Sequence, residues 1–515
     1  MSITTSVNGQ PYPAGPNAQQ SCGAGSCALT ATGAIKTADL HAGDNDVEVD
    51  VTDVAGNVGT EEWAIELPGE DPMVQNQEAS DYSTQQNVPL NVAQAAVAAQ
   101  DQTAPLLPQL ETDLGNAFAG AWYDTTTNVL NLAVAAPNPP TLASVQQAQA
   151  DLSAANVPLT MVNFVAVTSN WDQLIAAQEA LDSQLDAQEM AGQVATAIDP
   201  QTNAVVQINT PPQLVEMSAS AAGRRSHGGR RNEVRVARGP WRGRSVKVRQ
   251  TVRHVKSLAL RAFACRGFGS FFGAFGGGRP PYTGCDNPVR GGVAMVSPPN
   301  YGAGGYNLCT PGFLGFASGF RALLTAGHCI RDTGGCLGSE WGSLNSRGGR
   351  FPFGHPYPAV AGAHCYVDDG VSGDYGTISL VNGARVGRHS YIYVASSRQT
   401  QANSAYWIHR LGDRPAKNMI VCNSSGPLLQ NGSHTSCGYV LYPSHDVVLS
   451  GTKFYHLIIT SNCGEPGSSG GPLFRRGVGY GLLLGGPKGV TQPQNCQADF
   501  EPATTAAAGQ NFRLN

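Results

Sequence analysis

Charged residues are scarce in this sequence. Asp, Glu, Lys and Arg make up 13% of the 515 residues, about half of their usual share in soluble proteins. Hydrophobic residues make up 41%, which is enough for ordinary globular cores, and the chain contains 62 glycines. Low charge combined with many Gly, Ser, Thr and Asn residues favours an extracellular, β-rich protein over a cytosolic enzyme.

Cysteine pairs of the kind that hold zinc are absent. None of the 12 cysteines stands in a C-x-x-C pair, and nine of them lie between positions 285 and 496. An even number of cysteines without metal-binding spacing indicates disulfides and an oxidising compartment. We therefore expect disulfide bonds, no metal and no cofactor.

Export and membrane signals are also missing. No run of 18 apolar residues occurs, which predicts that no helix spans a membrane. The first residues, MSITTSVNGQPYPAG, have neither the basic nor the apolar region of a signal peptide. Because the cysteines indicate an extracellular protein, export either uses an unusual route or depends on a natural N-terminus ahead of residue 1. We favour the second explanation.

The length predicts roughly three or four domains, and the first is a small β-sandwich over residues 1–67. The stretch DNDVEVDVTDVAGNVGTEEWAIEL alternates Val with polar residues, turns at the AGN of positions 55–57 and then resumes its alternation. A period of two around a turn is typical of a hairpin with half-buried strands. The segment resembles the immunoglobulin-like modules of bacterial surface and secreted proteins. Cys22 and Cys27 can close a short loop, and a spacer role is favoured over ligand binding.

Residues 72–210 have a different composition, with no cysteine and much Ala and Gln. SVQQAQADLSAA and WDQLIAAQEALDSQLDAQEM carry apolar residues at helical spacing, whereas NVLNLAVAA and LTMVNFVAV are typical of strands. The order of strand, helix, strand, helix and strand predicts a small α/β domain. Nothing in it indicates catalysis.

Residues 211–284 form a basic and Gly-rich connector. Positions 224–256 hold 12 of the 32 basic residues and carry a net charge of +11, against −5 for the whole chain, so the remainder carries −16. Such a run, with Trp241 inside it, can bind nucleic acid or another polyanion. It can equally be a solvated, cleavable linker that pairs with an acidic surface. Because no nucleic-acid-binding module accompanies the charge, we expect no nucleic-acid partner.

Residues 285–515 contain the candidate catalytic residues. FRALLTAGHCI places His328 at the end of an apolar strand, and DDGVSGDYGTISL places Asp374 where an alternating strand begins, so that its side chain can be buried. Asp368 and Asp369 lie in a more polar loop, where we expect them to be solvated. The Gly- and Pro-rich loop GEPGSSGGPLF holds Ser469.

These three residue types form a complete nucleophilic set. Serine is a weak nucleophile that needs a base within hydrogen-bond reach. Histidine titrates near neutral pH and can take the proton and return it to the leaving group, and a buried aspartate holds the imidazole in place. The backbone N–H groups of Gly467 and Ser469 are the expected oxyanion hole.

The order of TAGHC, DYG and EPGSSGGPLF is similar to that in chymotrypsin-fold serine proteases, above all the streptogrisin and alpha-lytic type that bacteria secrete. The resemblance covers residues 285–515, including CTPGFLGF ahead of the His328 strand and FEPATTAAAGQNF near the C-terminus. It implies a trypsin-like protease domain of two six-stranded antiparallel β-barrels, with the triad in the cleft between them. The implied activity is that of a monomeric serine endopeptidase acting on proteins or peptides.

The same resemblance implies most of the disulfides. The family pattern carries over as Cys309–Cys329, Cys463–Cys496 and Cys422–Cys437, and Cys309 stands where it can staple the His328 loop to the preceding strand. Proximity in the sequence adds two further pairs, Cys336–Cys365 and Cys265–Cys285.

The upstream α/β region resembles the pro-domain of that family, through DLGNAFAGAWYD and VLNLAVAA. Double β-barrels depend on non-local contacts and fold slowly, and the resemblance implies that a tethered pro-domain assists folding and blocks the cleft until it is cleaved. Because the connector is expected to be the most cleavable part of the chain, we expect a stable C-terminal fragment that begins between about 257 and 293.

Two positions depart from the family pattern. Ser468 stands where the family has an Asp that anchors the nucleophile loop, so we expect the disulfide Cys463–Cys496 to hold that loop instead. Leu484 stands where the family has a Ser that hydrogen-bonds the triad Asp. Neither change removes a member of the triad.

The resemblance also implies the pocket for the side chain before the scissile bond, lined by Ser461, Asn462, the loop 464–467, Leu484, Gly485 and Gly486. Ser461 is neutral, whereas a trypsin-like preference needs an Asp there to pair with the buried cation. Glu465 precedes Pro466 and is expected at the rim. We therefore expect cleavage after uncharged, mainly apolar residues.

Three functions remain open from the sequence. The favoured one is a secreted serine endopeptidase made as a zymogen. The main alternative, supported by Ser468 and Leu484, is a weakly active or inactive protease-fold protein that serves as an extracellular binding or surface module through residues 1–67. The third is polyanion binding through residues 224–256.

Overall fold

The structure is a computed structural model of the chain. It describes residues 2–7, 10–11, 17–23, 26–32, 43–52, 58–67, 72–209, 214–216, 219–222, 290–293, 295–297, 305–333, 335–337, 341–344, 350–356, 365–380, 390–394, 406–425, 435–487 and 496–514. The basic segment 224–256, the expected start of the fragment between 257 and 289, and the pair Cys265–Cys285 lie outside these residues.

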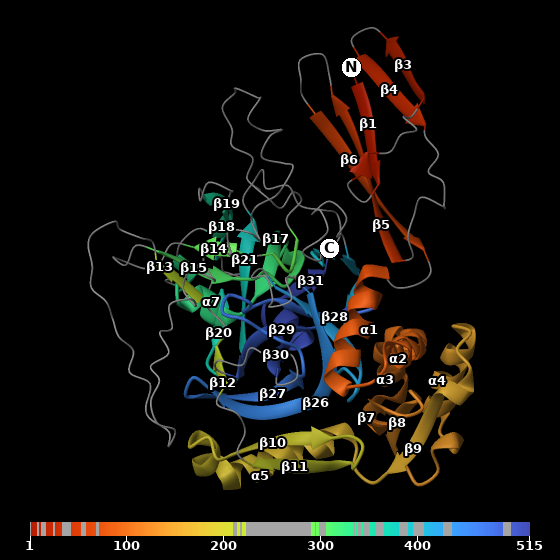
Figure 1. Cartoon of the computed structure of the whole chain (residues 1–515), viewed down its shortest axis with the longest axis vertical. Coiled ribbons are helices and arrows are strands. Elements are labelled where there is room, and N and C mark those ends of the chain that lie inside the picture. Colours follow the sequence, from red (N-terminus) through yellow and green to blue (C-terminus); the bar gives the residue numbers. More distant parts are fainter. Residues whose placement is uncertain are drawn as a thin grey trace.

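The N-terminal residues form strands, as the alternating pattern predicts (Figure 1). β1 (Ser2–Val7), β2 (Gln10–Pro11), β5 (Gly43–Thr52) and β6 (Val58–Leu67) form one sheet in the order β2-β1-β5-β6. β5 and β6 pair antiparallel from Thr52 opposite Val58 outward. The turn expected at AGN lies outside the described residues. β3 (Asn17–Gly23) and β4 (Ser26–Thr32) form a separate hairpin with Cys22 opposite Cys27. The immunoglobulin-like assignment remains a prediction.

Three helices that the sequence patterns did not predict follow this module. α1 (Pro72–Gln86) and α2 (Leu90–Thr103) pack against each other, and α3 (Leu107–Leu114) follows them. Small and aromatic residues of α1 and α2 form a buried cluster with Ile420 of the later part of the chain, whereas the buried leucines of α3 belong to a larger apolar cluster. These helices are therefore stabilised by tertiary packing, which local periodicity does not reveal.

The α/β region has the predicted order of elements. β7 (Phe118–Tyr123) and β8 (Leu130–Ala135) pair antiparallel, and α4 (Ala143–Ala154) connects β8 to the parallel strand β9 (Val162–Val167). α5 (Trp171–Met190) begins with a capping box between Asn170 and Gln173, which satisfies free N–H groups of its first turn. The hairpin of β10 (Val194–Asp199) and β11 (Ala204–Asn209) comes last.

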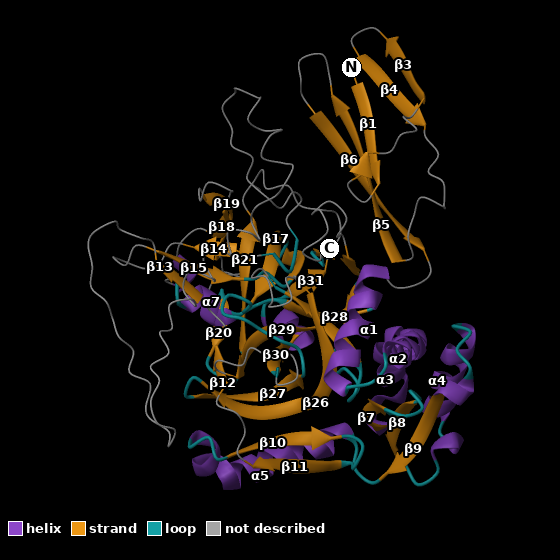
Figure 2. Ribbon diagram, in the orientation of Figure 1, coloured by secondary structure: helices purple, strands orange, loops and turns teal. Residues whose placement is uncertain are grey.

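The C-terminal half contains two large sheets (Figure 2). The first has the order β13-β15-β14-β18-β19-β21-β17-β16-β31, with β20 paired to β21. Its strands are β13 (Ala219–Ala222), β14 (Met295–Ser297), β15 (Gly305–Cys309), β16 (Phe313–Ala317), β17 (Phe320–Thr325), β18 (Trp341–Leu344), β19 (Arg350–Pro356), β20 (Tyr366–Asp368), β21 (Asp374–Leu380) and β31 (Phe512–Leu514). A small hairpin of β22 (Ser390–Ile392) and β23 (Tyr406–Ile408) is separate from it.

The second sheet closes on itself. Its order is β26-β25-β28-β29-β30-β27, and β27 pairs back with β26, which gives the expected six-stranded barrel. The strands are β25 (Ile420–Ser424), β26 (Thr435–Leu449), β27 (Thr452–Thr460), β28 (Pro472–Arg475), β29 (Val478–Pro487) and β30 (Ala498–Pro502), with β24 (Arg410–Leu411) beside β29. Among the described residues, the first sheet does not close into a barrel.

The two halves of the chain are joined into one body. β10 pairs with β26, so the β10–β11 hairpin extends the second sheet. One buried apolar cluster includes Leu130 and Trp171 of the α/β region together with Val478 and Phe500 of the barrel. In Figure 1 the α/β region lies below and beside the barrel, against β26 and β27.

Two short strands lie within the expected connector, residues 211–284, which stays a prediction. β12 (Leu214–Glu216) pairs with β29 of the second sheet, and β13 pairs with β15 of the first. These short segments are strands because the edges of the two sheets supply hydrogen-bond partners for them, and their own sequence, LVEMSASAA, carries no strong strand pattern.

The expected disulfides in the described part of the chain are present. They are Cys309–Cys329, Cys336–Cys365, Cys422–Cys437 and Cys463–Cys496. In the part of the chain that the structure describes, every helix is too short or too polar to cross a membrane.

Candidate active site

His328 lies directly after an apolar strand, as predicted, but within a short helix. β17 leads into α7 (Gly327–Arg331), and His328 is fully buried. A Cβ atom at Gly327 would lie 1.9 Å from the carbonyl oxygen of Val367 and 2.8 Å from Oδ1 of Asp374. Only glycine therefore lets the backbone before His328 approach the Asp374 strand so closely.

Asp374 holds His328 through both of its carboxylate oxygens. Oδ2 contacts Nδ1 of the imidazole, and Oδ1 accepts a 2.7 Å hydrogen bond from the backbone N–H of His328. Both side chains are fully buried, and Asp374 is the first residue of β21. This arrangement fixes the orientation of the imidazole relative to its own backbone.

The neighbouring acids differ from the expectation in one case. The carboxylate of Asp368 is 2% exposed and is paired with Arg331, so it is not solvated as expected. The Arg331 guanidinium reaches it from α7 and excludes water from it. Asp369 is exposed and accepts a hydrogen bond from the N–H of Ser372.

The loop that carries Ser469 lies against the end of the His328 strand. A Cβ atom at Gly470 would lie 2.1 Å from Oγ1 of Thr325 and 2.3 Å from the carbonyl oxygen of Thr310. Thr310 N–H also donates a 2.8 Å hydrogen bond to the carbonyl oxygen of Ser469. Because Thr325 is three residues before His328, this contact brings the segments of the two candidate catalytic residues, His328 and Ser469, together.

The Ser469 hydroxyl is directed towards the strand of the expected pocket. Its Oγ donates a 3.4 Å hydrogen bond to the carbonyl oxygen of Leu484. Gly467 has a φ of +99°, a conformation that glycine adopts at little cost. Among the described residues, neither the Gly467 N–H nor the Ser469 N–H donates a hydrogen bond to another residue, so both remain available to a developing oxyanion.

Ser468 takes part in holding the loop. Its hydroxyl oxygen accepts a 3.1 Å hydrogen bond from Glu465 N–H, and its own N–H donates to the Glu465 carbonyl at 2.8 Å. Thr310 adds a 2.9 Å bond from Oγ1 to the carbonyl of Gly467. The loop is thus fixed by neutral hydrogen bonds as well as by Cys463–Cys496, where the family uses an acid.

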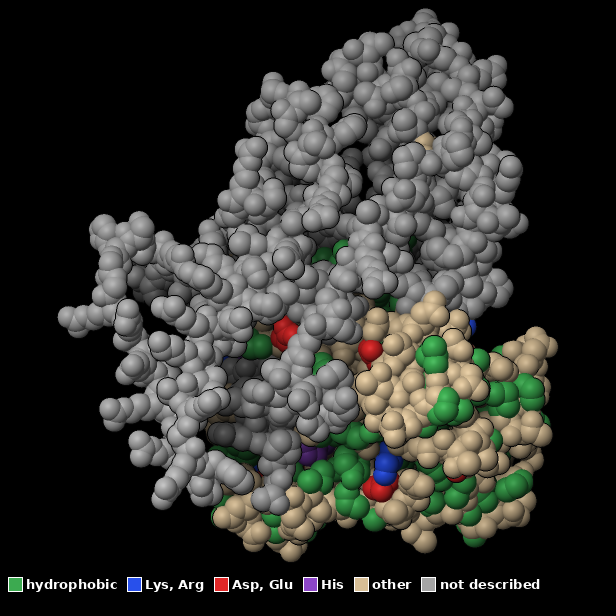
Figure 3. All heavy atoms as spheres, viewed as in Figure 1, with side chains coloured by type: hydrophobic (Ala, Val, Ile, Leu, Met, Phe, Trp, Pro, Cys, Tyr) green, Lys and Arg blue, Asp and Glu red, His purple; other side chains and the backbone are tan. Residues whose placement is uncertain are grey.

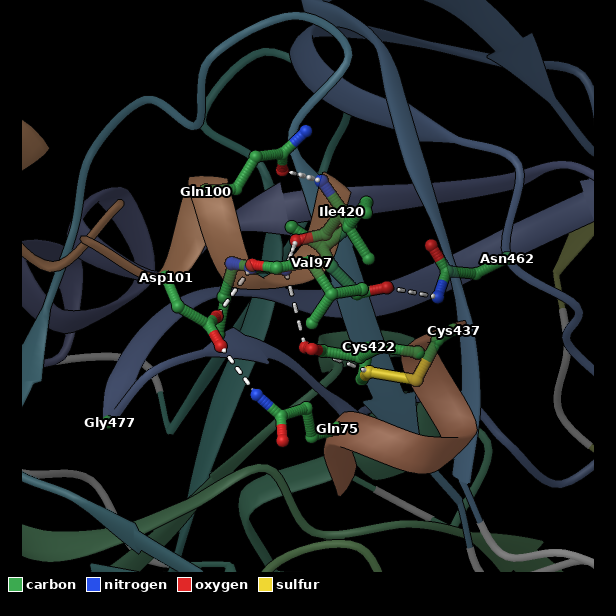
Figure 4. Close-up of polar contacts among 12 residues, drawn as sticks. Gln75, Val97, Gln100, Asp101, Ile420, Cys422, Cys437, Asn462 and Gly477 are labelled. Carbon is green, nitrogen blue, oxygen red and sulfur yellow. Dashed lines mark hydrogen bonds and ion pairs between the residues drawn. A yellow bond between two sulfur atoms is a disulfide. The ribbon is translucent and has the colours of Figure 1, made fainter. Parts of the chain in front are cut away.

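The residues of the expected pocket do not all face the same space. Ser461 Oγ donates to Oε1 of Gln85 on α1 at 2.6 Å and accepts from Tyr439 N–H at 2.9 Å. The Asn462 amide donates to the carbonyls of Val421 and Ser436 at 3.1 and 2.7 Å. Figure 4 shows this amide directed at the strand that carries Ile420 and Cys422. Asn462 therefore braces the barrel wall.

The third side of the expected pocket is the end of β29. Leu484 is buried in a small apolar cluster with residues of β26 and β27, and Gly485 and Gly486 pair with β12. Glu465 is half-buried, and burial raises the pKa of its carboxyl to about 7. Its place at the rim of the pocket remains a prediction.

A buried acid beside Asp374 was not predicted. Oε2 of Glu501 accepts a 3.1 Å hydrogen bond from the backbone N–H of Asp374. Burial, opposed by that hydrogen bond and assisted by the charge of Asp374, raises the pKa of Glu501 to about 8. The signal in the sequence was the two acids, Asp499 and Glu501, in the otherwise apolar segment ADFEPA.

A buried ion-pair network also escaped prediction. Arg475 on β28 is 1% exposed, and its guanidinium lies 2.6 Å from Asp101 and 3.4 Å from Glu78. Both acids come from α2 and α1. Figure 4 shows Asp101 hydrogen-bonded to Gln75, and Gln100 reaching the N–H of Ile420. These contacts tie the first two helices to the barrel.

In the surface view of Figure 3, few acidic and basic side chains appear on the coloured face, and in its lower middle a basic side chain lies beside an acidic one. Among the described residues, His, Cys, Asp and Glu side chains form no cluster able to hold a metal ion.

Comparisons with known proteins identify the family of the chain. Residues 91–150 match the family "Alpha-lytic protease pro N-terminal". Streptogrisin-A of Streptomyces griseus is 28% identical over 224 residues, 42% of this chain and 58% of that protein. The chain thus spans a little under three fifths of that relative. Serine protease 2 of Streptomyces fradiae is 30% identical over 204 residues, 38% of this chain and 94% of that protein.

Solved structures give weaker matches. Nocardiopsis protease is 19% identical with a TM-score of 0.32, and covers 44% of this chain and 98% of its own. The alpha-lytic protease homolog N4 is 23% identical with a TM-score of 0.29, and covers 44% and 97%. The assignment rests on the pro-region match and the sequence relatives. The chain belongs to the streptogrisin and alpha-lytic type of serine proteases, and it carries the pro-region of that family.

Proposed function

We propose that the chain is the zymogen of a secreted serine endopeptidase with Ser469 as nucleophile, His328 as general base and Asp374 as the residue that orients it. The observation that carries this proposal is the double contact of Asp374 with the ring and the backbone of His328, beside the loop of Ser469. The four disulfides support an oxidising, extracellular location.

The proposed chemistry is acyl transfer. His328 takes the proton of Ser469 Oγ as that oxygen attacks the substrate carbonyl, and Asp374 stabilises the resulting imidazolium. The N–H groups of Gly467 and Ser469 bind the oxyanion, and one such donor contributes roughly 3–4 kcal/mol in the transition state. His328 then protonates the leaving amine, and water hydrolyses the acyl-enzyme.

Residues 72–209 are proposed to act as an intramolecular inhibitor and folding aid. The contacts of α1 and α2 with Arg475, and the pairing of β10 with β26, support a region that stays bound to the barrel while it forms. Gln85 on α1 also hydrogen-bonds Ser461 in the expected pocket. Slow formation of non-local strand pairs is the step that such a template assists.

Single substitutions in the nucleophile loop test the activity. Ser469→Ala should reduce peptide hydrolysis by several orders of magnitude, because triad members act as a unit. Ser468→Ala, the matched control, should retain much of it, because it removes only one of the hydrogen bonds that hold the loop. A fluorophosphonate probe should label the processed parent at Ser469. A processed chain that takes up no probe would favour the inactive, surface-module alternative.

A further inference from the structure

Glu501 is a buried acid that contacts the main chain of the candidate triad. It is the fourth residue of β30 and is 2% exposed, and its Oε2 accepts a 3.1 Å hydrogen bond from the backbone N–H of Asp374. The side chain of Asp374 in turn contacts the ring and the backbone N–H of His328. A single residue, Asp374, therefore connects Glu501 to the imidazole.

The backbone before Asp374 is shaped to admit the carboxyl group of Glu501. Gly373 has a φ of +117°, and a Cβ atom there would lie 2.7 Å from Oε1 of Glu501 and 2.8 Å from Cε1 of Tyr375. Glycine is the residue that fits both this φ and this space. The carboxyl group thus lies against the main chain of two successive residues, so a change in its charge acts on Asp374 at short range.

The titratable groups nearest to Glu501 are acids and a tyrosine. Burial first, and then the charges of Asp374 and Asp369, raise the pKa of Glu501 to about 8, although the hydrogen bond from Asp374 opposes this shift. Tyr375, on the same strand as Asp374, also interacts electrostatically with Glu501. The carboxyl group is therefore mostly neutral at pH 7 and becomes negative as the pH rises towards 9.

The elements that pack on β30 direct their charged groups elsewhere. β29 contributes Tyr480 as its titratable side chain, and α8 (Ala503–Gly509) contributes none. On β27, Lys453 pairs with Glu189 of α5 and lies beside the ring of Tyr455, and His456 faces α5 as well. In the part of the chain that the structure describes, none of these groups is a cation directed at Glu501.

We propose that Glu501 is a positioning residue of the triad: it holds Asp374 through the main chain, and its charge adjusts how firmly His328 holds a proton during the reaction. This inference rests on the proposed function and adds a residue that acts on the same site. With Glu501 neutral, Asp374 alone stabilises the imidazolium. With Glu501 ionised, a second negative charge stabilises the imidazolium that forms as Ser469 attacks. Activity should therefore rise twice with pH, first as His328 loses its proton and again as Glu501 loses its own.

The experiment measures kcat/KM of the processed enzyme on one peptide p-nitroanilide between pH 6 and pH 10. The parent should show a second rise of about two- to ten-fold above the pH at which His328 has lost its proton. Glu501→Gln keeps an acceptor for Asp374 N–H but cannot ionise, so its profile should equal that of the parent near pH 7 and reach a plateau after the first rise. Asp413→Asn makes the same carboxyl-to-amide change at a partly exposed acid and should keep both rises.

Two further variants test the hold on Asp374 and the charges around Glu501. Glu501→Leu should lower kcat at pH 7 at least about ten-fold with little change in KM, because it removes the acceptor and lets Asp374 move. Glu501→Gln, compared at the same pH, should restore most of this loss. Asp369→Asn should move the second rise to lower pH, because it removes one of the charges that raise the pKa of Glu501. If Glu501→Leu does not fold, the profile of Glu501→Gln decides.

The outcomes separate this inference from the proposed function. A parent that takes up the fluorophosphonate probe and hydrolyses the substrate, but whose pH profile has the same shape as that of Glu501→Gln, overturns the inference alone. A Glu501→Gln chain that gives no active enzyme also overturns it, because the amide keeps both the hydrogen bond and the neutral charge of the parent at pH 7. A parent that neither hydrolyses the substrate nor takes up the probe overturns the proposed function and this inference together.

Discussion

Ser461 is a neutral residue in the expected substrate pocket, and its hydroxyl is already engaged by Gln85 and by Tyr439 N–H. A pocket without a fixed negative charge does not compensate the desolvation of a Lys or Arg side chain. Burial of a bulky apolar side chain, in contrast, contributes roughly 1.5–3 kcal/mol. The lack of a carboxylate at position 461 therefore predicts a preference for uncharged residues before the scissile bond.

We expect processed enzyme to cleave after Leu, Met, Phe or Tyr about ten- to a hundred-fold faster than after Arg or Lys. A panel of peptide p-nitroanilides that differ only in the residue before the scissile bond measures this as kcat/KM. Faster turnover of the Arg substrate than of both the Leu and the Phe substrate would contradict the prediction and would assign Glu465 a place inside the pocket.

Glu501 is a second residue, after Ser461, whose effect can be predicted from its own surroundings. Its pKa is raised to about 8 in the folded chain, from an ordinary value near 4.5. The folded state then binds a proton that the unfolded state has released, so the free energy of unfolding falls as pH rises between these two values. The slope contributed by one group is at most about 1.4 kcal/mol per pH unit.

Glu501→Gln should remove this contribution while keeping an acceptor for Asp374 N–H. In the Ser469→Ala background, which prevents self-digestion, the variant should lose less thermal stability than the parent between pH 5 and pH 8. Calorimetry of both chains across this range provides the measurement. Parallel curves for the two chains would mean that Glu501 does not titrate between these pH values.

At the scale of elements, the helices show what sequence periodicity could and could not predict. α5 was predicted over its full length, because its apolar spacing and its capping residues are local signals. α1 and α2 were not, because they are held by Ile420 and by the ion pairs of Arg475, which come from more than 300 positions away. β12 and β13 were not predicted for the same reason, because their hydrogen-bond partners are edge strands that lie far away in the sequence.

The residues of the candidate site divide in the same way, into those that local sequence motifs reveal and those that only the fold reveals. His328, Asp374 and Ser469 stand in short motifs that the sequence displays directly, and the structure brings their segments together. Glu501 and Arg475 act through partners that are distant in sequence, so only the fold reveals them. Asn462 was assigned to the pocket because of its place beside Cys463, although its amide braces the barrel wall.

Asp101→Asn should destabilise the uncut chain through Arg475. Removing one partner of a buried ion pair costs up to roughly 3–5 kcal/mol, because the remaining charge stays out of water. Asp172→Asn, at an exposed position in the first turn of α5, changes the same charge and should cost well under 1 kcal/mol. Urea unfolding of both variants in the Ser469→Ala background tests this, and equal midpoints would contradict it.

On the scale of the whole molecule, a cluster of acids joins α5 to the β26–β27 hairpin. Glu189 pairs with Lys453, which also lies 3.9 Å from Asp182 and Asp186. Burial first, then the neighbouring Asp182, raises the pKa of Asp446 well above its usual value, and burial raises the pKa of Glu189 to about 7. Glu179 and His456 are the other titratable groups at this contact, 4.0 Å from each other.

This cluster predicts that the pro-region is held more weakly at alkaline pH. Both acids bind protons more tightly in the associated state than when separated and hydrated, so association is favoured at pH 6 and is lost progressively as pH rises towards 9. Gel filtration of the nicked complex at both pH values measures it. Asp446→Asn should reduce the difference between the two pH values, and an identical shift in that variant would refute the role of Asp446.

The pairing of β12 with the second sheet and of β13 with the first has a kinetic consequence. Because these strands hold the start of the connector against the two sheets of its own molecule, a cut that the proposed enzyme makes there needs no encounter between molecules. The first cleavage should then be first order and independent of protein concentration. Dilution should leave its half-time unchanged. A mixed population of parent and Ser469→Ala chains should initially yield fragments of the parent alone. Activation of one molecule would then not accelerate the first cleavage of another.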